Sequence, residues 1–421
     1  MSSTTHESTP APRRGCLACS RPLRHTFVDL GMSPLCESYV PAEKLEAMEP
    51  FYPLHVYVCD GCFLVQLQEF VSPEHIFTEY AYFSSYADSW VEHMRRYAEA
   101  ISDRLSLGKD SFVVEVASND GYLLQHFVRM GIPVLGIEPA ANVAKVAIDK
   151  GIPTLVKFFG EATARSVLAD TGPADLICGA NVLAQVPDPS DFVRGLKTLL
   201  KPGGVVTIEF PHLMKLMAEN QFDTIYHEHF SYFSFLSAEL VFAAQGLTLF
   251  DVEEIPTHGG SLRVYARHSE DGARPMTERA RALRQREVDA GLLRLETYAG
   301  FGEQVKETKR KLLQFLIEAK RAGKTVVGYG APGKGNTLLN YCGIRTDFLD
   351  FTVDKSPYKQ GKFLPGTHIP IFAPEKIREV RPDFVLILPW NFREEIVKQM
   401  AEVRSWGGRF VVPIPAVKVL D

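Results

Sequence analysis

The sequence predicts an α/β protein of three parts: a small zinc-binding module followed by two Rossmann-like domains. Three observations lead to this prediction. Two Cys-x2-Cys pairs lie near the N-terminus, apolar strand-like segments alternate with helical ones from about residue 75, and a glycine-containing strand–turn–helix pattern begins near residue 324. At 421 residues the chain also exceeds the length that one hydrophobic core usually organises, so several domains are expected.

The composition is typical of a soluble globular protein, with 46% hydrophobic and 23% charged residues. A net charge of −5 gives no indication of nucleic acid or an anionic membrane as a partner. No apolar run approaches the roughly 20 residues that span a bilayer. Residues 1–15 are polar and proline-rich and lack the apolar centre of a secretory signal, so a disordered leader is expected. We therefore expect a cytoplasmic monomer.

Residues 16–74 are expected to form the first module. Two Cys-x2-Cys pairs can supply a closed four-sulfur shell for one tetrahedral zinc ion. Their 39-residue spacer is long, so a small subdomain is expected between them. A redox pair or a chance pairing is the alternative. Because a closed shell leaves no position for a substrate, the zinc is expected to be structural. The expected ligands are Cys16, Cys19, Cys59 and Cys62.

Residues 75–269 are expected to form the central domain. Strand-like runs cover residues 111–117, 133–138, 175–181 and 204–210, with helical or turn-rich segments between them. This alternation indicates a parallel sheet with helices on both faces. Ligands of such sheets bind beyond the carboxyl ends of the strands, so the chemistry is expected there.

The turn after the first of these strands indicates a nucleoside site. In Glu115-Val-Ala-Ser-Asn-Asp-Gly121, the Asn, Asp and Gly residues tolerate the positive φ of a tight turn. Glu138 ends the next strand, 23 residues after Glu115, where an acid can accept hydrogen bonds from both ribose hydroxyls. This order is similar to that of class I methyltransferases, whose ligand has no pyrophosphate. The expected S-adenosylmethionine contacts are Glu115, Ala117, Ser118, Asn119, Asp120, Gly121, Tyr122, Glu138, Pro139, Asn181 and Val182.

A polar and aromatic cluster at residues 223–233 follows the fourth strand. Its imidazoles, carboxylate and phenol can supply a general base, an orienting partner and an oxyanion donor. Two alternatives stay open, a metal site that uses His227 and His229 and a half-buried structural strand edge. A second aromatic cluster at residues 79–86 suits a sugar or a nucleobase, although ordinary packing explains it nearly as well.

The segment at residues 258–263 has two glycines, Ser261 and Arg263. It is expected either to place Arg263 near an anion or to form a turn into the next strand.

Residues 270–421 are expected to form a second Rossmann-like domain that binds a nucleotide sugar. After helical segments at residues 274–322, Gly328-x-Gly330-x-x-Gly333 fits the Rossmann fingerprint, and the next strand ends at Asp354. Free N–H groups at the start of a helix attract phosphate, and Lys334, Lys355 and Lys359 would add positive charge. The same turn could bind NAD(P), which would make the chain an oxidoreductase.

Together these motifs resemble those of the sugar C-methyltransferases of deoxysugar and antibiotic biosynthesis. The resemblance rests on the paired cysteines, the turn at 115–121, Tyr226-His-Glu-His229, His258-Gly-Gly-Ser-Leu-Arg263 and the glycine turn at 328–337. It covers nearly the whole chain, and the motifs occur in the same order. It implies a zinc-binding domain, a methyltransferase domain and a C-terminal Rossmann-like domain. It also implies methyl transfer from S-adenosylmethionine to a ring carbon of a TDP-linked 4-keto-deoxysugar, with carbon 3 favoured over carbon 5.

The resemblance implies that His229 is the base, through an enolate, with Tyr226, Glu228 and Tyr80 nearby. The sequence departs from the family at Gln185, where relatives commonly have histidine, and glutamine cannot act as a base near neutral pH. An O- or N-methyltransferase acting on a nucleotide sugar is the nearest alternative. The expected substrate contacts are Tyr82, Ser84, Gln185, Ser261, Arg263, Gly333, Lys334, Asn336, Thr337 and Lys355.

Overall fold

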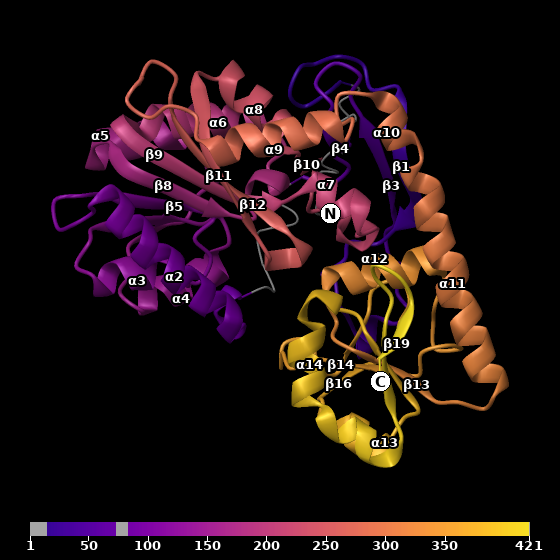
Figure 1. The fold of residues 1–421 in the computed structure, drawn as a ribbon. Coiled ribbons are helices and arrows are strands. Elements are labelled where there is room, and N and C mark those ends of the chain that lie inside the picture. The colour runs from indigo at the N-terminus through magenta and orange to yellow at the C-terminus, as the bar shows by residue number, and fades with distance from the viewer. Residues whose placement is uncertain (1–14, 73–82, 421) are drawn as a thin grey trace, which may run out of the picture.

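The computed structural model describes residues 15–72 and 83–420. It contains a small N-terminal sheet and two larger α/β layers, which confirms the predicted fold class (Figure 1). The predicted positions of Tyr80 and Tyr82 lie outside the described residues. No helix within the described ranges is both long and apolar enough to cross a bilayer.

The N-terminal module is an antiparallel sheet that the central domain completes. Buried and half-buried positions alternate along its second strand in sequence, as expected of a strand with one face in the core. The last strand of the sheet comes from a segment more than 150 residues further along the chain, which the sequence prediction missed. In sheet order the strands are β1 (His25–Ser33), β3 (Tyr52–Val58), β4 (Val65–Leu67) and β10 (Ser231–Tyr232).

The central sheet has seven strands. The strands predicted from apolar runs are all present and parallel, but an antiparallel hairpin extends one edge, so the sheet is mixed. In sheet order the strands are β11 (Leu247–Ile255), β12 (Ser261–His268), β9 (Leu200–Pro211), β8 (Ala174–Ala180), β5 (Val113–Val116), β6 (Val134–Ile137) and β7 (Thr154–Leu155).

Helices cover both faces of the central sheet, and each face has its own hydrophobic core. On one face lie α2 (Asp88–Leu105), α3 (Leu124–Arg129) and α4 (Ala141–Asp149), and on the other lie α5 (Glu161–Thr171), α6 (Pro189–Leu199) and α8 (Phe235–Ala244) (Figure 1). The short elements α7 (Leu213–Ala218), η2 (Ser84–Tyr86), η3 (Leu183–Gln185), η4 (Phe222–Thr224) and η5 (Thr257–Gly259) connect these layers.

Three helices lead from the central domain to the C-terminal domain, as the segment at residues 274–322 predicted. They are α9 (Glu278–Asp289), α10 (Leu295–Ala299) and α11 (Phe301–Arg321). Figure 1 shows α11 running beside β1 of the N-terminal module toward the C-terminal domain. One hydrophobic core includes side chains from the N-terminal sheet, α11 and the C-terminal domain, so the module is packed against both.

The C-terminal sheet has six strands and is parallel except at its last strand. In sheet order they are β16 (Ile371–Phe372), β14 (Thr352–Val353), β13 (Val326–Tyr329), β17 (Phe384–Ile387), β18 (Arg409–Val412) and β19 (Lys418–Leu420). The helical elements are α12 (Gly333–Cys342), α13 (Glu375–Val380), η6 (Trp390–Phe392), α14 (Arg393–Gln399) and η7 (Ala401–Trp406). A short ladder joins β15 (Lys362–Phe363) to β2 (Val40–Pro41), which is followed by η1 (Ala42–Lys44).

Candidate active site

The four predicted cysteine ligands come together in the N-terminal module. The Sγ atoms of Cys16 and Cys62 lie 3.4 Å apart, those of Cys19 and Cys59 lie 3.5 Å apart, and all four lie within 4.8 Å of one another. Tetrahedral zinc with Zn–S bonds of about 2.3 Å fits this cluster. Gln66 Nε2 donates to Cys16 Sγ, as outer hydrogen bonds to metal-binding sulfur do. The cluster is a closed structural zinc site.

The turn after β5 is shaped by three residues with left-handed backbone. Ala117, Asn119 and Gly121 have φ values of 56°, 49° and 80°. The Asn119 N–H donates to Glu138 Oε2 and the Ala140 N–H to Glu138 Oε1, both at 2.9 Å. These bonds fix the Glu138 carboxylate beyond the end of β6, while burial raises its pKa. Each oxygen keeps a lone pair for a further donor.

A cavity of about 270 Å³ opens at the carboxyl ends of β5, β6 and β8. Nine of the predicted contacts line it, namely Ala117, Asn119, Tyr122, Glu138, Pro139, Asn181 and Val182 from the cofactor set and Ser84 and Gln185 from the substrate set.

Four predicted cofactor contacts do not line this cavity. Glu115 is fully buried within the sheet, and burial raises its pKa well above the usual range. Ser118 is buried, and Asp120 Oδ2 accepts a hydrogen bond from the Ser85 N–H at 3.1 Å. A side chain at Gly121 would overlap Ile152. These residues support the conformation of the loop and do not face the cavity.

Other lining residues were missed by the sequence analysis. The aromatic side chains of Trp90, Phe158 and Phe159 form apolar walls, and Asp188 and Asp191 add carboxylates. Asp188 caps α6 by accepting a hydrogen bond from the Asp191 N–H at 2.9 Å. The sequence Asp188-Pro189 is a helix-start signal that could have identified this part of the wall.

The chemistry of the cavity suits S-adenosylmethionine. Aromatic and aliphatic walls accept an adenine ring, and the fixed Glu138 carboxylate can accept hydrogen bonds from ribose hydroxyls. Carboxylates rather than cationic side chains are the charged groups in the lining, which fits a cationic sulfonium ligand without phosphate. When bound, this cofactor supplies an electrophilic methyl group.

His229 is held as a neutral imidazole with a defined tautomer. Its Nδ1–H donates to the Thr224 carbonyl at 3.0 Å, so the lone pair is on Nε2. Burial, together with the positive charge of Lys334, lowers the pKa of His229 to about 4. The Tyr226 ring lies 4.1 Å from the imidazole, centre to centre, and burial raises the pKa of its hydroxyl. The pair is a neutral imidazole beside a neutral phenol.

His229 lies next to the wall of the cofactor cavity. The following residue, Phe230, donates its N–H to the Ala184 carbonyl at 2.7 Å. Ala184 precedes Gln185, whose side chain lines the cavity. This backbone contact holds the base segment against η3 at the cavity's edge.

The two neighbours of His229 in the motif make contacts with the N-terminal module. His227 Nε2–H donates to the Pro53 carbonyl at 3.2 Å. Glu228 Oε1 accepts a hydrogen bond from the Cys36 thiol at 3.4 Å. Thus His227 and His229 have different partners. Within the described residues, the zinc cysteines are the group of side chains suited to bind a metal, and these histidines are not part of it.

The segment at 258–263 contributes a histidine to the site. The Asn181 side-chain amide donates to His258 Nε2 at 2.9 Å, and Trp90 packs edge-on against the imidazole. His258 has a left-handed backbone with φ of 54°. Burial and nearby Lys334 lower its pKa to about 3, so it is neutral. Ser261 is buried, and its hydroxyl donates to the Thr257 carbonyl at 2.9 Å.

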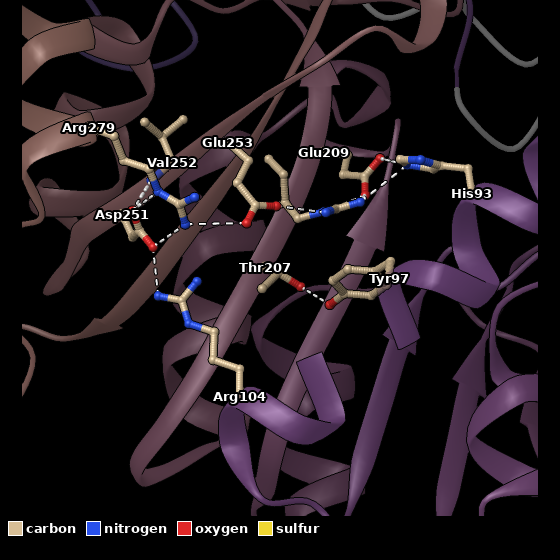
Figure 2. Close-up of polar contacts among 10 residues, drawn as sticks. His93, Tyr97, Arg104, Thr207, Glu209, Asp251, Val252, Glu253 and Arg279 are labelled. Carbon is tan, nitrogen blue, oxygen red and sulfur yellow. Dashed lines mark hydrogen bonds and ion pairs between the residues drawn. The ribbon is translucent and has the colours of Figure 1, made fainter. Parts of the chain in front are cut away.

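Arg263 belongs to a buried ion network instead of facing the cavity. Its Nε donates to Glu209 Oε1 at 2.7 Å, and its Nη1 donates to Glu253 at 2.8 Å. His93 binds the other oxygen of Glu209 at 3.2 Å. Figure 2 shows this network running across β9, β12 and β11 to Asp251. Hydrogen bonds to the two carboxylates occupy the guanidinium donors, so Arg263 links β12 to β9 and β11.

The glycine turn after β13 is surrounded by the protein itself. The Ala331 N–H donates to Asp354 Oδ2 at 2.7 Å, and the Ala331 carbonyl accepts from Tyr39 and Lys359. A side chain at Gly333 would come within 2.9 Å of the Cys36 sulfur. The N-terminal module therefore lies directly on this turn.

The other predicted contacts in this region differ in their surroundings. The Asn336 side chain donates to the Cys36 carbonyl at 2.5 Å, and the Thr337 hydroxyl donates to the Ile225 carbonyl at 2.9 Å. Lys334 Nζ donates to Asn391 Oδ1 at 2.9 Å, whereas Lys355 is exposed. Asn336 and Thr337 thus join the three parts of the molecule at the helix start.

Three family models match successive segments of the chain. Residues 16–77 match a family model described as a zinc binding domain, residues 90–252 one described as a methyltransferase domain, and residues 256–415 one described as a C-methyltransferase C-terminal domain. The chain is 36% identical to C-methyltransferase NovU of Streptomyces niveus over 96% of both chains. It is 33% identical to a ubiquinone biosynthesis O-methyltransferase of Xanthomonas oryzae pv. oryzae over 25% of this chain and 44% of the relative.

Solved structures resemble the chain over a smaller part. Magnesium protoporphyrin IX methyltransferase of Synechocystis, with bound S-adenosylmethionine, matches 42% of this chain and 81% of its own, at 15% identity and a TM-score of 0.31. An S-adenosylmethionine-dependent methyltransferase of Clostridium acetobutylicum matches 42% of this chain and 92% of its own, at 12% identity and a TM-score of 0.35.

Proposed function

The chain belongs to the S-adenosylmethionine-dependent C-methyltransferase family, and on this premise we propose that it methylates a ring carbon of a TDP-linked 4-keto-deoxysugar. Carbon 3 is the favoured position over carbon 5, and the product belongs to deoxysugar and antibiotic biosynthesis. The substrate is a small molecule, no nucleic-acid partner is proposed, and the enzyme acts as a cytoplasmic monomer. Assignment of the sugar rests on the motif resemblance, and assignment of the chemistry rests on the site.

The observation that carries the proposal is the hydrogen bond from His229 Nδ1–H to the Thr224 carbonyl. It leaves the lone pair on Nε2, and the Phe230 N–H bond to the Ala184 carbonyl places this segment at the edge of the cofactor cavity. A pKa of about 4 keeps the imidazole unprotonated at neutral pH, so it is ready to accept a proton. Gln185 lines the same cavity but cannot accept a proton, which supports His229 as the proposed base.

The proposed first step is removal of a proton from the carbon next to the ketone. The C–H bond breaks, its proton goes to His229 Nε2, and the electron pair moves through the carbon–carbon bond onto the ketone oxygen as an enolate. The Tyr226 hydroxyl, kept neutral by a raised pKa, can donate a hydrogen bond in the site. S-adenosylmethionine, held by cavity residues such as Glu138, would supply the methyl group: the enolate carbon would bond to it as the methyl–sulfur bond breaks, and S-adenosylhomocysteine would leave with the electron pair. General bases contribute typically about 10²–10⁴-fold.

The nucleotide half of the substrate is proposed to lie toward the C-terminal domain. Lys355, which is exposed near the carboxyl end of β14, is proposed to face the nucleotide, whereas Gly333 and Lys334, which start α12, are proposed to contact the sugar. Ser84 lines the cofactor cavity and is proposed to contact the sugar, as are Tyr80 and Tyr82. Glu228 is proposed to orient the site through its contact with Cys36.

A His229→Ala variant tests the assignment of the base. We expect methylation of a TDP-4-keto-deoxysugar to fall by at least about 10²-fold, because the proposed general base is removed. Binding of S-adenosylhomocysteine, measured by isothermal titration, should be retained and shows that the variant is folded. His227→Asn is the matched control, since His227 binds Pro53 and should leave turnover near that of the wild type.

The result that contradicts the assignment is near-wild-type turnover of His229→Ala. The substrate class is tested separately by titrating TDP into the protein saturated with S-adenosylhomocysteine. Binding of both ligands at separate sites supports the nucleotide sugar. Failure of the protein to bind TDP or to methylate any TDP-4-keto-deoxysugar contradicts it.

A further inference from the structure

Lys334 is a half-buried cation with few partners. Its Nζ donates to Asn391 Oδ1 at 2.9 Å and lies 4.9 Å from the centre of the Trp390 ring. None of the ion pairs found among residues 15–72 and 83–420 includes it, in contrast to Lys359, which pairs with Glu37. An ammonium group can donate three hydrogen bonds, so two remain. Such a cation is suited to meet a negative charge that a ligand brings.

The helix that carries Lys334 is joined to the segment that carries the base. Three residues further along α12, the Thr337 hydroxyl donates to the Ile225 carbonyl at 2.9 Å. Residues three apart on a helix are neighbours on its surface. Ile225 follows Thr224, whose carbonyl accepts the hydrogen bond from His229. Two hydrogen bonds one residue apart therefore fix α12 relative to the imidazole.

Trp390, the ring under Lys334, is also fixed to the methyltransferase domain. Its indole N–H donates to Asp223 Oδ2 at 2.7 Å, and Asp223 is fully buried. On its other side, a side chain at Gly259 would come within 2.6 Å of the ring, so η5 packs closely against it. His258 lies in η5, and its imidazole is bonded to Asn181 in the cofactor cavity.

These contacts bring the Lys334 end of α12 close to the segments that carry His229, His258 and Asp223. Electrostatic effects agree with this placement, because the charge of Lys334 lowers the pKa of both histidines. The negative charge of Asp223 in turn counteracts the lowering of the Lys334 pKa that burial causes. The cation is therefore near enough to both imidazoles to act on their charge.

We propose that Lys334 is a catalytic residue that stabilises the enolate oxygen of the substrate. This role rests on the proposed function, because it requires a ketone next to the carbon that loses its proton. That ketone oxygen is two bonds from the carbon whose proton His229 removes. The Lys334 ammonium donates a hydrogen bond to this oxygen and compensates the charge that develops on it. No covalent bond to lysine forms, and the proton remains on His229.

A fixed cation contributes most where charge develops during the reaction. Removal of one hydrogen-bond donor to such an oxyanion typically costs about 10²–10³-fold in rate. A lysine that bound the diphosphate would contribute to substrate binding and not to the rate of proton removal. The diphosphate carries the same charge before and after the reaction. The two roles therefore separate in a measurement that keeps binding and proton removal apart.

The experiment measures exchange of the proton next to the ketone with deuterium oxide, followed by mass spectrometry of a TDP-4-keto-deoxysugar. S-adenosylhomocysteine fills the cofactor cavity, so that proton removal is observed without methyl transfer. Lys334→Met keeps an unbranched side chain and removes the charge. At saturating substrate we expect exchange to fall by about 10²-fold, whereas the dissociation constant for TDP changes less than about twofold.

Lys398→Met is the matched control, because Lys398 is exposed on α14 of the same domain, and it should exchange at the wild-type rate. Lys334→Arg should recover part of the exchange, since it restores the positive charge. Unchanged exchange in Lys334→Met at saturating substrate, with TDP binding weakened tenfold or more, assigns the lysine to the diphosphate and overturns the proposal. If the wild type itself neither exchanges nor methylates any such sugar, the proposed function fails first.

Discussion

Two turns of this molecule share one local structure and differ in what lies in front of them. In the first, Glu138 accepts the Asn119 N–H from the turn after β5 and the Ala140 N–H two residues along its own chain. In the second, Asp354 accepts the Ala331 N–H from the turn after β13 and the Ser356 N–H two residues along. Each acid follows the neighbouring parallel strand.

The surroundings of the two turns are different. Glu138 lines the cofactor cavity, together with Ala117 and Asn119 of its turn. In the second turn, the Ala331 carbonyl binds the Tyr39 hydroxyl at 2.5 Å and Lys359 Nζ at 2.8 Å. The turn that best fits the Rossmann fingerprint is therefore the one that the N-terminal module covers.

The comparison shows that the acid after the next strand has a structural role in both turns, because it accepts hydrogen bonds from backbone N–H groups. A buried carboxylate is stable there because two amide donors bind it. Whether the same arrangement also binds a ligand depends on segments far away in the sequence. Substitutions at the two acids should therefore have different consequences.

The largest effect is expected for Glu138→Gln. The amide puts a donor against one of the two backbone N–H groups and removes the charge that accepts hydrogen bonds from ribose. A hydrogen bond to a charged group contributes about 1.5–3 kcal/mol, so we expect S-adenosylhomocysteine to bind about 10- to 100-fold more weakly. Isothermal titration measures it. Unchanged affinity would show that the two carboxylates have the same, purely structural role.

Asp354→Asn makes the same chemical change in the second turn. Here the expected cost is in folding, about 1–3 kcal/mol of the free energy of unfolding, because a backbone N–H loses its acceptor. Urea unfolding measures the cost, and the affinity for S-adenosylhomocysteine should stay within about twofold of the wild type. A cofactor affinity reduced as strongly as in Glu138→Gln would contradict the distinction between the turns.

Most elements near the first turn could be predicted from the sequence. The apolar runs at 111–117 and 133–138 correspond to β5 and β6, and the spacing of two cysteine pairs identified the zinc site. These features are local, since strand periodicity and metal-ligand spacing are written in a few consecutive residues. Family motifs then indicated His229 and its neighbours.

What the sequence analysis missed depends on contacts between remote segments. Tyr39 is 292 residues from Ala331, and no pattern near either residue indicates that they touch. The strand β10 has two residues and forms only because β4 offers its edge. For Lys334 the fingerprint favours phosphate, which stays a prediction, while the contact of its neighbour Trp390 with the remote Asp223 could not be predicted from the sequence.

Tyr39→Phe tests how much one hydroxyl of the N-terminal module stabilises the second turn. The hydroxyl lies within hydrogen-bond distance of the Ala331 carbonyl and of Glu37 Oε2. Because Lys359 still binds the Ala331 carbonyl, the expected loss is only about 0.5–1.5 kcal/mol of the unfolding free energy. Urea unfolding of the variant and of the wild type measures this difference in unfolding free energy. A loss above about 3 kcal/mol would mean that this single hydroxyl, and not the whole covering segment, holds the turn closed.

The smallest effect concerns Lys334, which lies in the first turn of α12, just after the second turn, and whose charge affects the proposed base. The positive charge of Lys334 disfavours the imidazolium form of His229, whose pKa is lowered to about 4 mainly by burial. Removing that charge in Lys334→Met should therefore raise the pKa of His229, while burial still keeps it below the ordinary value. Titration of the His229 ring protons by NMR measures the change, and Lys398→Met should show none. A pKa that stays the same or falls would mean that Lys334 is too far from the base to influence it, and the two turns would then be independent in function as well as in structure.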